Sequence, residues 1–217
     1  MKRLPTRSRA EIDAALPGVL RQLRSDGLIA YPTETVYGFG GATSERAVQR
    51  LRALKRREAL KPFLLLVPSP DQAPGVQWSA AARAVAQRFW PGPLTLALPA
   101  VPNGFPQGII SSEGTVALRA SPHPFVRALM AAWQAPITST SANAPGSPPA
   151  RDADGVLAAL EEIGVRDVLV LDAGRLPESA PSTIVAVADH RVRVLRAGAI
   201  GIDELRNELS GIGIHVE

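Results

Sequence analysis

Basic residues gather where a predicted helix ends, in the segment "LKRREALKP". Lys55 and Arg57 stand where the amphipathic pattern stops, and an extended chain beyond that point can turn both toward one anion, with Lys61 nearby. A planar guanidinium beside a compact ammonium suits phosphate oxygens. Cations at a helix C-terminus also complement the helix dipole, for about 0.3–1 kcal/mol. Both interpretations of this segment stay open.

The segment "PITSTSAN" is a second cluster, in which five of eight residues are Thr, Ser or Asn. In an extended chain Ser139, Ser141 and Asn143 face one side, and Thr138 and Thr140 face the other. Buried hydroxyls and amides cost about 1–3 kcal/mol each when they are unpaired, so this run needs partners. Those partners are either backbone groups or the phosphate and carboxylate of a ligand.

Further polar side chains stand at the ends of predicted strands. Arg119 closes the run "TVALR", where a guanidinium suits either a carboxylate clamp or a structural ion pair. Ser182 and Thr183 open the strand of "PSTIVAV", and Arg196 closes the strand before "AGAI". A hairpin would bring these three residues to one end of a sheet. The stretch "YPTETVYGFG" adds hydroxyls, a carboxylate and glycines, which predicts a concave site for a small polar substrate.

Several other chemistries are excluded. The chain has no Cys, which excludes disulfides, thiolate metal sites and cysteine nucleophiles and suits the cytoplasm. The three His residues show no ligand spacing, so we expect no metal site built from side chains. Neither G-x-x-x-x-G-K-[ST] nor G-x-G-x-x-G occurs, so side-chain cations and strand ends must hold any triphosphate. No run approaches the ~20 apolar residues of a membrane span.

The net charge of +4 and the pI of about 10.1 favour anionic partners such as nucleotides, RNA or a phosphorylated substrate. A solvated surface in an arginine-rich proteome is the alternative. With 217 residues, 46% of them hydrophobic, the chain can bury a sizeable core. We therefore expect one domain that spans residues 1–217.

The elements that must position these residues follow from apolar periodicity. Helices are expected over 9–27, 44–56, 79–90, 123–134 and 152–164, and strands over 28–32, 63–67, 94–98, 115–119, 136–141 and 167–172. Residues 183–196 read as two antiparallel strands around a turn at Asp189 and His190. This alternation predicts an α/β fold, a mixed twisted sheet with helices packed on it. The Pro- and Gly-rich segment from Ala144 to Arg151 is the expected mobile loop.

Seven segments in order resemble the YrdC/TsaC family of L-threonylcarbamoyladenylate synthases. They are "YPTETVYGFG", "LKRREALKPF", "FWPGPLTLAL", "TVALRA", "PITSTSANAPG", "PSTIVAV" and "LRAGAI". The K-x-R and S-x-N pairs of the family appear as Lys55/Arg57 and Ser141/Asn143. The chain looks like the short form of the family, a single YrdC-like domain with a large concave site and no extra C-terminal domain.

The resemblance implies a nucleotidyltransferase that joins L-threonine, bicarbonate (or carbon dioxide) and ATP into threonylcarbamoyl-AMP and pyrophosphate. Magnesium is expected on the triphosphate. The product would pass to downstream transferase proteins that make N6-threonylcarbamoyladenosine beside the anticodon of tRNA. Whether the chain contacts tRNA directly stays open.

The resemblance also implies two groups of site residues, with Lys55, Arg57, Ser141 and Asn143 as the catalytic set. The ATP site would comprise Lys55, Arg57, Lys61, Thr115, Ser141, Asn143 and Arg196. The threonine site would comprise Thr35, Arg119, Ser139 and Ser182. The two sites must adjoin because the carbamate formed on threonine attacks the α-phosphate, a step that depends on positioning and charge stabilisation.

Two residues depart from the pattern of the longer family members. Leu66 stands where many of them carry a histidine, and Lys61 replaces an asparagine. Two other functions stay open. A module that binds double-stranded RNA or tRNA would use the same basic surface and weaken steeply with salt. A carbamoyl-transfer domain like that of hydrogenase maturation proteins would normally accompany zinc-finger regions, for which the chain has no Cys.

Overall fold

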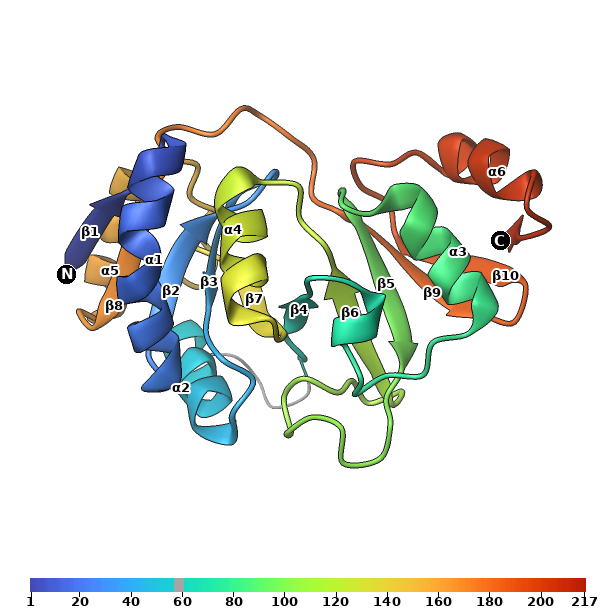
Figure 1. Cartoon of the computed structure of the whole chain (residues 1–217), viewed down its shortest axis with the longest axis horizontal. Coiled ribbons are helices and arrows are strands. Elements are labelled where there is room, and N and C mark those ends of the chain that lie inside the picture. Colours follow the sequence, from blue (N-terminus) through green and yellow to red (C-terminus); the bar gives the residue numbers. More distant parts are fainter. Residues whose placement is uncertain (57–60) are drawn as a thin grey trace.

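The strands form one twisted mixed sheet with helices packed on it, which confirms the predicted α/β class (Figure 1). This computed structural model describes residues 1–56 and 61–217. The helices are α1 (Arg9–Arg24), α2 (Glu45–Lys55), α3 (Ala80–Phe89), α4 (Pro124–Trp133), α5 (Ala153–Ile163) and α6 (Ile202–Ser210), with a short 3-10 helix at Pro70–Gln72. The strands are β1 (Lys2–Pro5), β2 (Leu28–Pro32), β3 (Tyr37–Gly40), β4 (Leu64–Leu66), β5 (Leu94–Pro99), β6 (Thr115–Arg119), β7 (Ile137–Ser141), β8 (Val168–Asp172), β9 (Thr183–Ala188), β10 (Arg191–Arg196) and β11 (His215–Val216).

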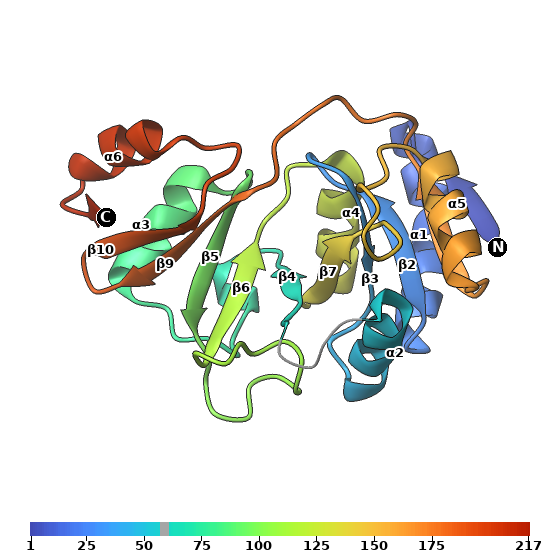
Figure 2. The ribbon, with the colours of Figure 1, turned by 180° about the vertical axis from the view of Figure 1, so that it is seen from behind.

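The sheet has two parts that meet at β7. Across the described residues the strand order is β1-β8-β2-β3-β7-β4-β6-β5-β9-β10-β11. We call β1, β8, β2, β3 and β7 the first half, and β4, β6, β5, β9, β10 and β11 the second half. The connection from β8 to β9, residues 173–182, is named the crossing segment because it runs from the first half to the second (orange in Figures 1 and 2).

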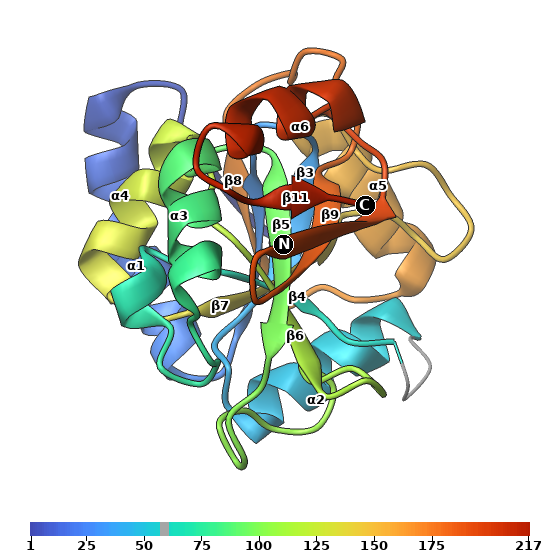
Figure 3. The ribbon, with the colours of Figure 1, turned by 90° about the vertical axis from the view of Figure 1, so that its right-hand side faces the viewer.

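Helices cover both faces of the first half. On β2, Ile29 and Tyr31 pack in the cluster that contains α1 and α4, whereas Leu28 and Ala30 pack in the cluster that contains α2 and α5. The alternation follows the period of two in a strand. Figure 3 views the molecule from the end of the second half, where α3 contacts β5 and β9 and α6 contacts β11. Within the described residues, no helix combines the length and the apolar character needed to cross a membrane.

The predicted caps and the predicted hairpin are confirmed. Ser44 and Asp152 precede α2 and α5, and each side chain accepts a hydrogen bond from the backbone amide three residues on, at 3.2 Å and 2.9 Å. Strands β9 and β10 pair antiparallel, as expected. Helix α2 ends at Lys55 because Arg56 adopts the left-handed conformation, with φ of 44°. The end of α2 thereby fixes where the Lys55 side chain begins.

The glycine-rich stretch "YGFG" is strand β3, although its composition predicts flexible backbone. It pairs antiparallel with β2 and with β7. A Cβ atom on Gly40 would lie 2.0 Å from the carbonyl oxygen of Thr138, so the close approach of β7 requires glycine there. Strands β1 and β11 were also absent from the predicted elements. Each lies at an edge of the sheet and buries few side chains, so it carries no apolar alternation to detect.

Candidate active site

A cavity of about 830 Å3 is lined by residues from both halves of the sheet and from the crossing segment. The predicted site residues that line it are Thr35, Arg119, Ser139, Ser141, Ser182 and Arg196. They come from the β2–β3 turn, β6, β7, the crossing segment and β10. The fold therefore brings together all four residues expected at a threonine site, and adds two that were expected at the ATP site.

Arg119 is a buried cation in the wall of this cavity, with 6% of its surface exposed. Its Nη1 lies 3.0 Å from Oε1 of Glu34, which reaches it from the β2–β3 turn. Among the described residues, the Arg119 Nε–H has no hydrogen-bond acceptor. The two interpretations of this arginine, an ion pair and a carboxylate clamp, are therefore compatible, since the ion pair leaves a donor unused.

Ser182 and Arg196 meet at the hairpin end, as the sequence predicted. Arg196 Nη2 donates to the carbonyl oxygen of Ser182 at 2.7 Å and to its Oγ at 3.2 Å, and the Ser182 hydroxyl also pairs with that of Thr95 at 2.9 Å. Burial lowers the pKa of Arg196, and the nearby Arg119 charge lowers it further. An arginine stays protonated at neutral pH, so the guanidinium groups of Arg119 and Arg196 place two positive charges at the larger cavity.

A second cavity, of about 330 Å3, adjoins the first. It is lined by Lys55, Arg56, Lys61, Thr140, Ser141, Asn143, Pro145 and Gly146. Thr140 and Ser141 line both cavities, so the two meet at the end of β7. The loop from Ala144 to Arg151 contributes to both walls. One side of the junction is rich in hydroxyls, and the other is rich in cations.

Lys55 joins the two predicted motif pairs by direct contact. Its Nζ donates to the carbonyl oxygens of Ser141 and Asn143 at 3.0 Å and 2.8 Å, and to Oδ1 of Asn143 at 2.8 Å. Ser141 Oγ donates to the same Oδ1 at 2.6 Å. The Asn143 amide in turn donates to the carbonyl oxygen of Ser147 at 2.6 Å, within the loop. Lys55 therefore holds the start of this loop, a role that its place at a helix end did not suggest.

The other predicted ATP residues differ in placement. Lys61 lines the second cavity and is exposed. Thr115 lines neither cavity, and its hydroxyl pairs with that of Ser111 at 2.8 Å. Arg57 lies outside the described residues. Leu66 is fully buried in the cluster with α1 and α4 and lines neither cavity.

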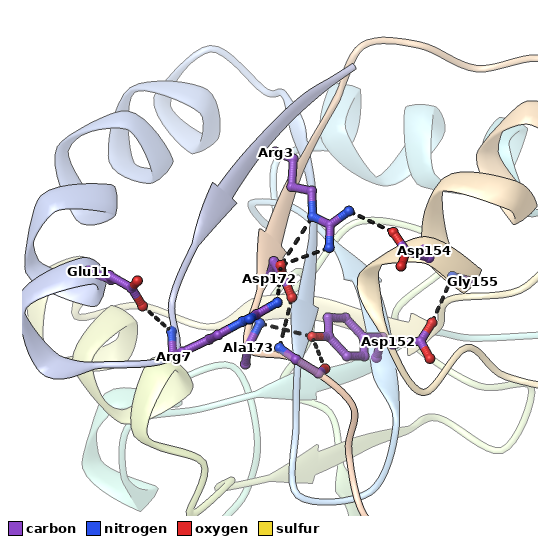
Figure 4. A network of polar contacts seen from close by, with 10 residues as sticks. Arg3, Arg7, Glu11, Asp152, Asp154, Gly155, Asp172 and Ala173 are labelled. Carbon is purple, nitrogen blue, oxygen red and sulfur yellow. Dashed lines mark hydrogen bonds and ion pairs between the residues drawn. The ribbon is translucent and has the colours of Figure 1, made fainter.

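Sequence reasoning missed the network that anchors the crossing segment (Figure 4). Asp172, at the end of β8, accepts hydrogen bonds from Arg3, Arg7 and the amide of Gly174. The Tyr37 hydroxyl accepts from the Ala173 amide at 2.9 Å and donates to the Gly174 carbonyl at 2.8 Å. Burial raises the pKa of this hydroxyl to about 12, so Tyr37 stays a donor. No spacing in the sequence relates these residues, which join through the sheet.

Asp172→Asn is expected to lower the free energy of unfolding by about 1–3 kcal/mol at neutral pH. Burial opposes ionisation of Asp172, but the Gly174 amide and the two arginines outweigh it and hold its pKa below the ordinary 3.8. The charged form therefore stabilises the fold above that value, and this stabilisation is lost as the pH falls through the native pKa. Urea unfolding at about pH 7 and about pH 3 measures the difference.

Asp13→Asn is the matched control, because the pair of Asp13 with Arg9 is exposed and is worth about 0.5 kcal/mol or less. A loss in the Asp172 variant that is the same at both pH values would contradict an electrostatic role.

The twisted mixed sheet with two adjoining cavities that meet at the end of β7 defines an α/β protein. Residues 21–198 match the family model of Sua5, YciO and YrdC proteins, whose description is "Telomere recombination". The chain belongs to this Sua5/YciO/YrdC family.

Several relatives carry the name threonylcarbamoyl-AMP synthase, among them those of Pyrococcus abyssi and Yersinia enterocolitica. That of Pyrococcus abyssi is 33% identical over 196 residues, which are 89% of this chain and 56% of the relative. That of Yersinia enterocolitica is 40% identical over 154 residues, which are 69% of this chain and 80% of the relative. The chain thus spans little more than half of the archaeal protein and four fifths of the bacterial one.

Solved structures agree with the fold. The P. abyssi Sua5 structure complexed with L-threonine superposes with a TM-score of 0.82 at 30% identity, and the match covers all of this chain and 62% of Sua5. Escherichia coli YciO superposes with a TM-score of 0.74 over 94% of this chain and 96% of YciO. Its 21% identity supports the fold alone.

Proposed function

We propose that this chain is a threonylcarbamoyl-AMP synthase, which makes threonylcarbamoyl-AMP and pyrophosphate from L-threonine, bicarbonate or carbon dioxide, and ATP. The observation that carries the proposal is the junction at Ser141, where a hydroxyl-rich cavity with a buried arginine meets a cavity lined by lysines. The names of the relatives and the threonine complex of P. abyssi Sua5 support the same activity.

In this proposal threonine lies in the larger cavity with its carboxylate on Arg119, and Thr35, Ser139 and Ser182 hold its polar groups. Its ammonium group loses one proton to give the amine, which adds to the carbon of carbon dioxide. Loss of a second proton from the nitrogen to water leaves a carbamate. A carbamate oxygen then bonds to the α-phosphorus of ATP, and the bond from that phosphorus to the bridging oxygen breaks. Pyrophosphate leaves with the bond electrons.

The phosphates would lie toward the second cavity, near Lys61 and the Ser141–Asn143 pair. Lys55 acts there by holding the loop, and Arg57 is retained as a phosphate ligand on the strength of its motif. The larger cavity has room beyond an amino acid, so Arg196 contacts the nucleotide from its wall. Thr115 is a weaker candidate, because it lines neither cavity.

Magnesium would enter this site as a companion of ATP. Among the described residues, no group of three or more His, Cys, Asp or Glu could hold a metal ion. The ion would therefore take phosphate oxygens and water as ligands. The proposed enzyme acts in the cytoplasm, with residues 1–217 as its YrdC-like domain, and its product goes to transferase proteins that modify tRNA.

Pyrophosphate release by the purified protein with ATP, magnesium and bicarbonate tests the proposal. Release that requires L-threonine is the expected result. Salt-sensitive tRNA binding without any release would instead favour the RNA-binding function and overturn the proposal.

A further inference from the structure

Glu34 is a partly buried carboxylate that lines neither cavity. It lies in the β2–β3 turn between Thr33 and Thr35, and its side chain is 16% exposed. Its Oε1 lies 3.0 Å from Arg119 Nη1, and its Oε2 accepts a hydrogen bond from the Ser121 hydroxyl. One carboxylate oxygen thus faces Arg119, the last residue of β6, and the other faces Ser121, two residues further on. Because Glu34 is not among the residues that line either cavity, its role in binding would pass through Arg119.

The turn that carries Glu34 is closed by hydrogen bonds of its own. Thr33 Oγ1 accepts from the amides of Thr35 and Val36, at 3.2 Å and 3.3 Å, and donates to the carbonyl oxygen of Val36 at 2.7 Å. These contacts fix the backbone on both sides of Glu34. The carboxylate is therefore presented to Arg119 from a rigid support.

The charges around the cavity explain why Arg119 needs this support. The positive charge of Arg196 acts on Arg119, and Arg196 has no carboxylate partner among the described residues. Two like charges in a partly buried space repel, and a buried guanidinium without a counter-charge is costly. The Glu34 carboxylate offsets one of the two charges and leaves the other for a single anionic group.

We propose that Glu34 is the positioning residue of the amino-acid site, holding the Arg119 guanidinium in the orientation that grips a substrate carboxylate. This inference rests on the proposed function, in which the α-carboxylate of threonine binds Arg119. The Nε–H of Arg119 is buried and has no acceptor among residues 1–56 and 61–217, so this orientation leaves the guanidinium with an unpaired donor.

Glu34→Ala is expected to raise KM for L-threonine at least about tenfold while KM for ATP changes less than about threefold. Glu34→Gln removes the negative charge and should raise KM for threonine about as much as Glu34→Ala, whereas Glu34→Asp keeps the carboxylate and should recover part of the loss. Glu113→Ala, which removes an exposed glutamate from the turn before β6, is the matched control and should change neither constant.

Equal rises in the two KM values, or a wild-type KM for threonine in Glu34→Gln, would assign Glu34 a merely structural role and overturn the inference. If Glu34→Ala does not fold, Ser121→Ala removes the support of Oε2 alone and should raise KM for threonine by about threefold. An unchanged constant in that variant would also contradict the inference.

The failure of the inference can be told from the failure of the proposed function. Wild-type protein that releases no threonine-dependent pyrophosphate would contradict the proposed function. If the wild-type protein is active but its Glu34→Ala variant binds L-threonine with unchanged affinity by calorimetry, only the inference about Glu34 is contradicted.

Discussion

Arg119→Ala is expected to raise KM for L-threonine by about a hundredfold, since charge-assisted hydrogen bonds are worth about 1.5–3 kcal/mol and 1.4 kcal/mol is tenfold. Arg119 is the buried cation of the cavity that gathers Thr35, Ser139 and Ser182. Steady-state kinetics with threonine varied at saturating ATP measure the effect.

Two further arginine variants sharpen this test. Arg119→Lys should recover only part of the loss, because an ammonium cannot present two parallel donors to a carboxylate. Arg127→Ala removes an exposed arginine from α4 and serves as the control for loss of a positive charge. A defect of Arg119→Ala confined to KM for ATP would move Arg119 out of the amino-acid site.

Lys55→Ala is expected to lower kcat/KM for ATP by more than about a hundredfold. The substitution removes a cation from the second cavity and frees three acceptors, on Ser141 and Asn143, that hold the start of the loop from Ala144 to Arg151. Kinetics with ATP varied at saturating threonine report the loss. Lys2→Ala, on exposed strand β1, is the control for a lost ammonium.

A double-mutant cycle separates the structural part of this effect. Lys55 and Asn143 act as one unit, so Asn143→Ala in the Lys55→Ala background should add little. Fully additive losses would show that Lys55 acts without Asn143, and the account of the loop would be wrong.

The parts of the fold with strong periodicity could be predicted, and the contacts between them could not. Helix α2 and strand β7 follow from their apolar and hydroxyl patterns, so the sequence located the ends from which Lys55 and Ser141 project. Their contact joins residues 86 positions apart. Such a contact depends on the order of the strands in the sheet. Local sequence patterns do not predict that order.

The direction of a side chain is a second feature that the sequence does not predict, as Glu34 shows. Its carboxylate stands out in "PTET", yet the sequence does not say that it turns away from the cavity to Arg119. Leu66 is a residue that the sequence singled out but that lies away from both cavities. This residue stands where the family resemblance predicts a histidine, and it is fully buried in a core cluster, so its apolar character serves packing in this chain.

The most direct test of the central claim is mass spectrometry of the nucleotide formed from ATP, L-threonine and carbon-13 bicarbonate with magnesium. We expect an adduct with the mass of threonylcarbamoyl-AMP that carries one labelled carbon and requires threonine. AMP without the adduct, or an adduct without the label, would contradict a synthase that builds the carbamate from bicarbonate or carbon dioxide.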